Sequence, residues 1–170
     1  MTSPLEPRRT TTHRIGAEVS SEELLLELPA AHSAARAARG LVRQFAMARG
    51  VGGNDLDKLV LVADELMTNA VDHGGGNGTM DAKDLTSPVR MQLALQVTAA
   101  GWQVEVSDQG GGDPELVDRL LHPEGEPDLE DERGRGLFLL ALECESIEVR
   151  RSADELGLCL VARCSLGMSG

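Results

Sequence analysis

Hydrophobic and polar residues recur along this chain with two different periods, which predict helices in one part and strands in another. Between Ala31 and Arg49 the apolar residues are spaced by three and four, as on a helix that covers a core with one face. After a glycine-rich break the same spacing resumes and runs to about His73, with Asn54 or Asp55 available to cap this second helix. These segments predict two amphipathic helices in succession.

The remaining regular segments show mostly strand patterns. Apolar and polar residues alternate twice in succession after the helices, with a short Ala-Ala-Gly turn between the runs, so an antiparallel hairpin is expected. Strands are expected at 23–28, 89–98, 102–107, 147–150 and 158–163, and a third helix at 137–144. The order predicts an α+β fold with helices packed on one face of a mixed, mainly antiparallel sheet.

Length and composition indicate one domain. With 170 residues and 41% apolar content the chain can build one good core. Residues 1–20 contain almost no large apolar side chains and are expected to form a disordered leader, followed by a domain over 21–166. Within it, the glycine-rich stretch 74–87 is expected to be flexible, and the acidic stretch 113–133 to form a flap with a short helical piece.

Charge and targeting signals exclude several classes of function. The net charge of −12 argues against direct nucleic-acid binding, which depends on a basic surface. We find no signal peptide and no apolar run long enough to span a membrane, so a cytoplasmic protein without membrane attachment is expected. The three cysteines predict reduced thiols and neither a disulfide framework nor a zinc site.

The second predicted helix carries the first candidate for chemistry. On a helical wheel Glu65 and Asn69 lie one turn apart, opposite the main apolar face, with Leu61 and Val62 on either side. An ordinary solvated polar face explains such a pair. The apolar neighbours favour a pocket instead, in which an amide orders a magnesium ion and a carboxylate polarises a hydroxyl or water.

Two further stretches carry polar or glycine residues at special places. Asp108 continues the inward-facing set of the preceding strand, so its carboxylate should be buried and needs hydrogen-bond donors. It either closes an Asx-turn or accepts a hydrogen bond from a ligand's exocyclic amine, such as that of adenine. Gly134-Arg135-Gly136 directly precedes the helix expected from Leu137, and its N–H groups could bind an anion.

Together these stretches resemble the three sequence boxes of the GHKL ATPase superfamily, which includes gyrase, MutL and histidine kinases. The matching residues are Asp64 to Ala70, Asp108 to Gly112 and Gly134 to Leu137. The longer pattern, which runs from about Leu24 to Ala162, is similar to the small anti-sigma-factor serine/threonine kinases of bacteria. The resemblance implies the Bergerat ATP-binding fold, with ATP and Mg²⁺ as ligands.

The resemblance also implies a role for each matching residue. Glu65 would be the general base that activates the attacking hydroxyl, and Asn69 would hold magnesium against the phosphates. Asp108 would bind the adenine amine, and Gly110 and Gly112 would shape the adenine pocket. These five positions define the expected catalytic, metal and base-binding parts of the site.

The third box and the flap would enclose the phosphates. Gly134 and Gly136 would line them under an ATP lid at 113–133. The family places a lid arginine against the terminal phosphate, and the spacing in this chain leaves Arg133 and Arg135 as the two candidates. The long glycine-rich loop and the acidic lid depart from the family pattern.

The function implied is that of an ATP-dependent protein serine/threonine kinase that acts as an anti-sigma factor. Its partners would be an anti-anti-sigma protein of the STAS type, which it phosphorylates, and a sigma factor, which it sequesters. Arg39 occupies the place of a partner-contacting arginine, although an ordinary solvated arginine explains it equally well. The family also forms homodimers through the sheet. The alternative functions are a nucleotide-gated binding module without kinase turnover and an α+β scaffold that binds no nucleotide.

Overall fold

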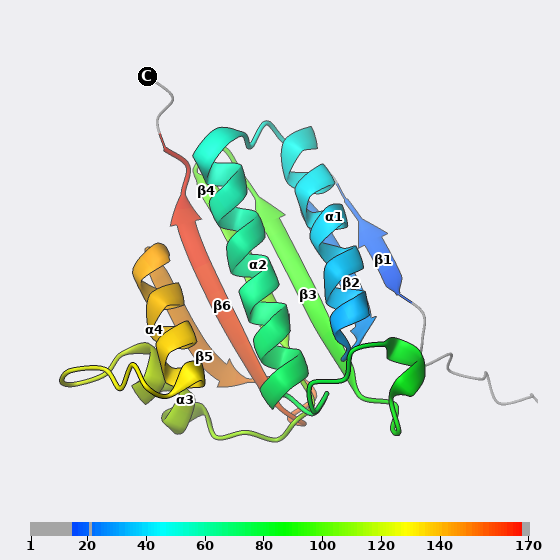
Figure 1. Ribbon diagram of the computed structural model, residues 1–170. Coiled ribbons are helices and arrows are strands. Elements are labelled where there is room, and N and C mark those ends of the chain that lie inside the picture. Colours follow the sequence, from blue (N-terminus) through cyan, green and yellow to red (C-terminus); the bar gives the residue numbers. More distant parts are fainter. Residues whose placement is uncertain (1–14, 21, 168–170) are drawn as a thin grey trace, which may run out of the picture.

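A six-stranded sheet carries two long helices side by side across one face (Figure 1). The computed structural model describes residues 15–20 and 22–167. The elements are β1 (Gly16–Val19), β2 (Glu23–Pro29), α1 (His32–Ala48), α2 (Gly53–His73), the 3₁₀ turn η1 (Ala82–Asp84), β3 (Arg90–Val97), β4 (Gly101–Ser107), α3 (Pro114–Leu121), α4 (Glu132–Glu143), β5 (Ser146–Arg151) and β6 (Leu158–Ser165).

The strand order is β1-β2-β3-β4-β6-β5, and every neighbouring pair is antiparallel. The α+β prediction with helices on one face is confirmed, and in the described part of the chain the sheet is antiparallel throughout rather than mixed. In Figure 1, α4 lies beside α2 at the β5–β6 edge of the sheet. This places the amino-terminal half of α4 next to the carboxyl-terminal half of α2.

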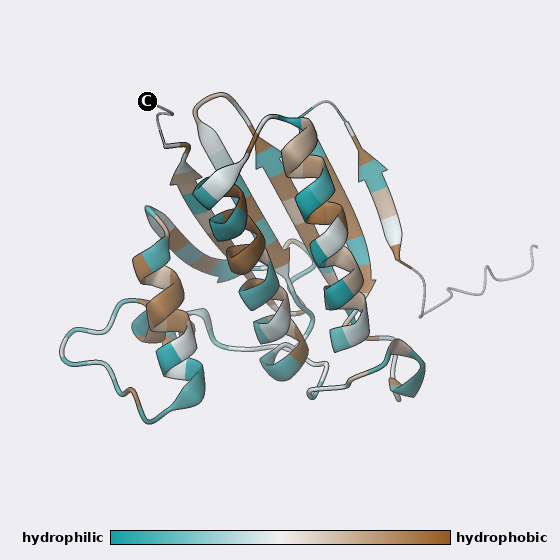
Figure 2. Cartoon of the chain, turned by 45° about the horizontal axis from the view of Figure 1, so that its top comes forward, coloured by the Kyte–Doolittle hydropathy of each residue, from teal (hydrophilic) through white to brown (hydrophobic). Residues whose placement is uncertain are grey.

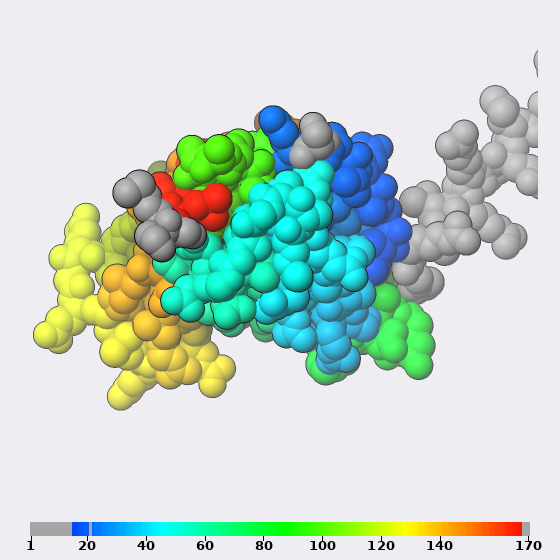
Figure 3. Space-filling view, turned by 90° about the horizontal axis from the view of Figure 1, so that it is seen from above, coloured from blue at the N-terminus to red at the C-terminus, as the bar shows by residue number. Residues whose placement is uncertain are grey.

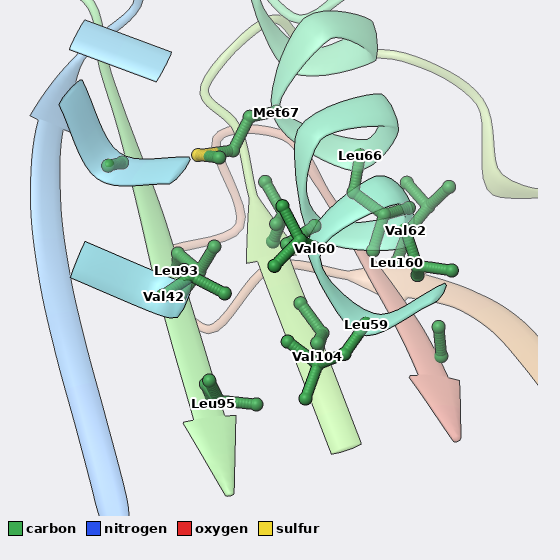
Figure 4. Close-up of a cluster of buried hydrophobic side chains, with 14 of the residues drawn as sticks. Val42, Leu59, Val60, Val62, Leu66, Met67, Leu93, Leu95, Val104 and Leu160 are labelled. Carbon is green, nitrogen blue, oxygen red and sulfur yellow. The ribbon is translucent and has the colours of Figure 1, made fainter. Parts of the chain in front are cut away.

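The core lies between the two long helices and the sheet. Val42 of α1, Leu59 of α2, Leu93 of β3 and Val104 of β4 are completely buried there (Figure 4). Figure 2 shows hydrophilic and hydrophobic residues alternating along α1 and α2, as expected for helices that bury one face. β3 alternates buried and more exposed residues along its length, so the two periods in the sequence correspond to real faces.

The amino-terminal strand corrects one prediction. Gly16–Val19 pair with β2 as an antiparallel edge strand, so the expectation of a disordered leader over residues 1–20 is wrong for these four residues. All four are exposed, and the strand is therefore held by backbone pairing rather than by a buried apolar face. Such a strand leaves no hydrophobic period in the sequence. Residues 1–14 lie outside the described residues.

The glycine-rich stretch 74–87 follows a defined path against the start of α1. Its carbonyl oxygens at Thr79 and Met80 accept hydrogen bonds from the backbone N–H groups of His32 (2.9 Å) and Ser33 (2.8 Å). These are N–H groups of the first turn of α1, which have no partner within the helix. In Figure 3 this stretch (green) and the lid segment before α4 (yellow) project on opposite sides of the helices. The flexibility expected for 74–87 stays a prediction.

The start of α2 corrects a second prediction. The helix begins at Gly53 with Gly52 as its N-cap, and no side chain caps it, so the expected role of Asn54 or Asp55 is wrong. Asp55 lies within the first turn and instead accepts a hydrogen bond from the backbone N–H of Gly167 (3.0 Å). Within residues 15–20 and 22–167, none of the helices has the length and apolar character needed to cross a bilayer.

Candidate functional site

The polar face of α2 borders a cavity of about 180 Å³ rather than open solvent. α2 forms one wall and α4 the other, because the two helices lie side by side. The lining residues are Glu65, Thr68, Asn69, Asp72 and His73 from α2, and Glu132, Arg133, Gly136, Leu137 and Leu140 from α4. The predicted pairing of Glu65 with Asn69 in one pocket is therefore present in the structure.

The apolar side of this cavity differs from the expected one. Val62 is fully buried in the core, and Leu61 remains 49% exposed on the surface of α2. The apolar wall comes instead from Leu137 and Leu140 of α4. A wheel of one helix cannot show this, because the second wall belongs to an element far away in the sequence.

The surroundings of Glu65 favour the protonated form of its carboxyl group more than water does. Partial burial in the cavity wall raises its pKa above the ordinary value of 4.5, and the neighbouring Asp64 carboxylate raises it further. The side chain itself remains exposed at the cavity mouth. A carboxylate with a raised pKa that a second molecule can reach is suited to general-base chemistry.

Asp108 is buried just after β4 ends, as its position in the strand predicts, with 6% of its surface exposed. Its Oδ1 atom accepts hydrogen bonds from the backbone N–H groups of Gly110 (3.0 Å) and Leu158 (3.2 Å). Among the described residues, no hydrogen bond is made to Oδ2. The Asx-turn and ligand recognition are thus compatible, because one oxygen closes the turn and the other remains available to a donor.

Three glycines seat the Asp108 loop against the end of α2. A Cβ at Gly74 would lie 2.5 Å from the Asp108 Cβ, one at Gly110 would lie 2.3 Å from the Gly74 carbonyl carbon, and one at Gly157 would lie 2.2 Å from Asp108 Oδ1. Only glycine fits at such approaches. Sequence reasoning assigned Gly110 to the adenine pocket and missed Gly74 and Gly157, although a glycine directly after a helix is a recognisable signal.

Replacement of Gly110 by alanine is expected to lower the free energy of unfolding by about 1–3 kcal/mol, because the added methyl group meets the Gly74 backbone, which cannot rotate away. Urea denaturation measures the loss. Gly125→Ala is the matched control, since a Cβ there meets nothing within 4 Å. Equal stability of the Gly110 and Gly125 variants would show that the close contact with α2 is absent in solution.

The third sequence box differs most from its prediction. α4 begins at Glu132, so Gly134, Arg135 and Gly136 lie inside the helix and not before it. Asp131 is the N-cap, and its carboxylate accepts hydrogen bonds from the backbone N–H groups of Arg133 (3.3 Å) and Gly134 (3.2 Å). The expected helix start at Leu137 is wrong because two glycines made the preceding turn look non-helical, whereas an aspartate cap is sufficient to start it.

The two candidate lid arginines occupy different environments. Arg133 lines the cavity, and its Nε atom is buried without a hydrogen-bond partner among the described residues. Burial lowers its pKa, an effect that the nearby carboxylates of Asp108 and Asp131 oppose. Arg135 is exposed and donates from Nη1 to the carbonyl oxygen of Leu129 (3.1 Å). The geometry therefore favours Arg133 as the arginine that faces a ligand.

Other predicted residues lie near the cavity or outside it. Asp108 does not line it but lies close enough to Arg133 to interact with it electrostatically. Gly112 is exposed, and its carbonyl oxygen accepts a hydrogen bond from Arg151 Nη1 (2.9 Å). Arg39 lies on α1, where its side chain is half-exposed and its Nη1 atom is 3.6 Å from Asp64 Oδ2.

Two of the cavity residues that sequence reasoning did not assign lie at the end of α2. Asp72 Oδ1 accepts a hydrogen bond from His32 Nε2 (2.8 Å), which links α2 to the start of α1. His73 lines the cavity, and burial together with the Arg133 charge lowers its pKa, while Asp72 and Asp131 oppose the shift. Both residues follow Asn69 by one turn on the same face of α2.

The three sequence boxes thus meet where α2, α4 and the end of β4 converge. A family model of the histidine kinase-like ATPase domain matches residues 28–164, which is well over half of the chain and includes every element of this site. The chain belongs to the histidine kinase-like ATPase family. As a histidine kinase-like ATPase domain it is an ATP-binding module of the GHKL type, and the predicted superfamily is confirmed. A search of curated proteins found no match.

The residues of this histidine kinase-like ATPase domain fit ATP and magnesium. Asp108 Oδ2 remains free to accept a hydrogen bond, as an adenine amine would require, and the orphaned Arg133 Nε remains free to donate one, as an anion would require. Gly136 lines the cavity where a Cβ would meet nothing within 4 Å. In the described ranges no group of three or more His, Cys, Asp or Glu could hold a metal, so magnesium would rely on Asn69 and the phosphates, as is common for this ion.

Proposed function

We propose that this domain is an ATP-dependent protein serine/threonine kinase that acts as an anti-sigma factor. It would phosphorylate a serine of an anti-anti-sigma protein of the STAS type and sequester a sigma factor. The observation that carries the proposal is Glu65, an accessible carboxylate with a raised pKa in the same cavity as Asn69. A module that only binds nucleotide has no need of a proton acceptor at this position.

The chemistry requires one proton acceptor and several groups that hold charge. The serine oxygen would attack the γ-phosphorus, the bond from that phosphorus to the β–γ bridging oxygen would break with release of ADP, and the serine proton would pass to Glu65. Magnesium, when bound, neutralises charge on the phosphates. Arg133 would face the terminal phosphate with its unpartnered Nε, and Asp108 would hold the adenine end.

Arg39 is the proposed contact for the protein partner. Its side chain on α1 is half-exposed, and its only ion pair among the described residues, with the partly exposed Asp64, is long. Exposed pairs of this kind contribute little stability and are easily exchanged. An acidic side chain of a partner could therefore take the place of Asp64 at small cost.

The proposal is tested by incubating the protein with ATP labelled on the γ-phosphate, Mg²⁺ and candidate STAS-type domains. Transfer of label to a serine of one domain, together with sigma-factor binding, would support it. The alternative, a nucleotide-gated regulatory module without turnover, predicts a rise in melting temperature with Mg-ATP and no transfer to any partner. If Mg-ATP neither raises the melting temperature nor supports transfer of label, the scaffold that binds no nucleotide is the function that remains.

Replacement of Gly136 by alanine is expected to separate stability from nucleotide binding. The methyl group removes backbone freedom in the middle of α4 and should raise the free energy of unfolding by about 0.5–1 kcal/mol. It also enters the cavity, so the affinity for Mg-ATP should fall, as measured by calorimetric titration. Gly40→Ala is the control, because Gly40 is also a helical glycine with free space around it and lies outside the cavity. Unchanged affinity in the Gly136 variant would place the phosphates elsewhere.

A further inference from the structure

Two exposed leucines lie beside the cavity that Glu65 lines. Leu61 of α2 is 49% exposed and Leu139 of α4 is 51% exposed. Leu61 precedes Glu65 on α2 and Leu139 follows Gly136 on α4, each by one helical turn, and both Glu65 and Gly136 line the cavity. The two leucines therefore continue the two walls of the cavity along the surface.

The opposite directions of α2 and α4 bring both leucines to the same end of the cavity. In Figure 1, α2 runs downward and α4 runs upward beside it. Beyond the leucines, Lys58 of α2 lies close enough to Cys144 of α4 to interact with it electrostatically. Leu61 and Leu139 thus lie between this contact and the cavity, one on each helix, and we call this pair the leucine strip.

The leucine strip lies where the attacking hydroxyl must arrive. Glu65 is exposed at the cavity mouth, so a second molecule reaches it across the outer surface of α2 and α4. Residues one turn apart on a helix have Cβ atoms about 5–6 Å apart, and side chains two positions apart on an extended strand are separated by about 6–7 Å. An extended segment that runs along the helices with its serine at Glu65 therefore places the side chain two positions away over the strip.

Acidic side chains beside the strip add a second requirement. Glu65, Glu132 and Glu143 are exposed, and none of them forms an ion pair within the ranges that the structure describes. The chain as a whole carries a net charge of −12. A segment that has basic side chains next to its apolar ones complements such a surface.

We propose that Leu61 and Leu139 dock the polypeptide segment that carries the phosphorylated serine. This segment has an apolar side chain two positions from the serine and a basic side chain beside it. The inference rests on the proposed kinase function and specifies its protein substrate. The leucines touch no reacting atom, so their loss should raise the KM for the acceptor and leave kcat nearly unchanged.

The test uses labelled peptides with a central serine as probes. The first peptide is Lys-Leu-Ala-Ser-Ala-Leu-Lys, the second has glutamine in place of both leucines, and the third has glutamate in place of both lysines. The protein variants are Leu61→Gln and Leu139→Gln, because glutamine is a good helix former of similar length. Leu116→Gln is the matched control, since Leu116 is 50% exposed on α3 and does not line the cavity.

Fluorescence anisotropy in the presence of Mg²⁺ and a non-hydrolysable ATP analogue measures peptide binding. Initial rates with γ-labelled ATP give KM and kcat. We expect Leu61→Gln and Leu139→Gln each to weaken binding of the first peptide about threefold to tenfold and to raise its KM by the same factor. The Leu116 variant should behave as the wild type, and all variants should bind Mg-ATP equally in calorimetric titration, which also verifies that they are folded.

The peptides test the requirements on the segment itself. The glutamine peptide should bind weakly to every protein, and the glutamate peptide should bind the wild type less tightly than the lysine peptide does. Glu143→Gln should narrow this last difference, because it removes one of the acids beside the strip. Equal binding of all three peptides to the wild type would overturn the inference.

Binding and transfer are measured separately, so the inference and the proposed function can fail independently. Phosphate transfer with unchanged KM in the Leu61 and Leu139 variants would overturn the docking role and leave the kinase in place. A loss of peptide binding that the Leu116 variant shares would also overturn the docking role. Leucine-dependent binding without transfer to the peptide or to any STAS-type domain would reject the kinase and keep the leucine strip only as a binding surface.

Discussion

A Glu65→Gln variant is expected to bind Mg-ATP with nearly wild-type affinity and to transfer phosphate about 10²–10⁴-fold more slowly. Glutamine has the shape of glutamate and remains at the cavity mouth, but its amide cannot accept the proton of a serine hydroxyl. Affinity should survive because the proposed function assigns Glu65 to the attacking side of the reaction and assigns Asn69, Arg133 and Asp108 to the nucleotide. Single-turnover transfer from γ-labelled ATP measures the rate, and calorimetry measures the affinity.

The control for this substitution is Asp57→Asn, on the same helix. Asp57 is exposed and pairs with Arg43 at 3.0 Å, away from the cavity. It should transfer phosphate at the wild-type rate. Equal transfer rates for the Glu65→Gln variant and the wild type would show that Glu65 takes no part in the chemistry. Loss of nucleotide binding in the variant would mean that the carboxylate positions ATP or its metal instead.

Because the pKa of Glu65 is raised, the effect of Glu65→Gln on stability should depend on pH. The folded chain holds the Glu65 proton more tightly than the unfolded chain does. Ionisation of Glu65 therefore lowers the free energy of unfolding at pH values above the folded pKa. This loss disappears as the pH falls through the folded pKa to 4.5 and below. Glu65→Gln should therefore raise the melting temperature at neutral pH and have little effect in strong acid. Phosphate transfer by the wild type should begin to fall, on acidification, at a pH above 4.5.

The periods of hydrophobic residues were sufficient to predict most of the fold. α1, α2, β3 and β4 each bury one regular face, and their predicted and observed bounds differ by one or two residues. β1 was missed because pairing, and not burial, holds it. The general lesson is that a sequence period reports a buried face, so an exposed edge strand leaves no trace in it.

The residues of the candidate site likewise fall into those that a local sequence pattern could predict and those that it could not. Glu65 and Asn69 were predictable because a single helix presents both, and Asp108 because its strand fixes the direction of its side chain. The role of Asp131 as the N-cap of α4 was not predictable from the sequence. It depends on where α4 begins, and two glycines concealed that start. Gly74 and Gly157 matter through contacts across the fold, which no local pattern contains.

Asp108→Asn is expected to weaken Mg-ATP binding by about tenfold to a hundredfold, the usual cost of losing a hydrogen bond to a charged group. The side-chain carbonyl of asparagine can still accept from the N–H groups of Gly110 and Leu158, so the loop should keep its shape. In place of the free carboxylate oxygen, however, an amide NH₂ would meet the adenine NH₂, and two donors cannot pair.

This exchange of acceptor for donor also changes which base is preferred. Guanine presents an oxygen acceptor where adenine presents its amine, so the wild-type carboxylate should reject GTP and the asparagine variant should tolerate it better. Calorimetric titration with both nucleotides gives the ratio of affinities, and Asp154→Asn, on the neighbouring exposed turn, is the control for a general loss of charge. A weaker variant with an unchanged ATP-to-GTP ratio would mean that Asp108 only shapes the loop. If the affinity ratio instead shifts toward GTP, the adenine amine binds to Oδ2 in the wild type. A change in loop stability alone would weaken both nucleotides alike and would not change this ratio.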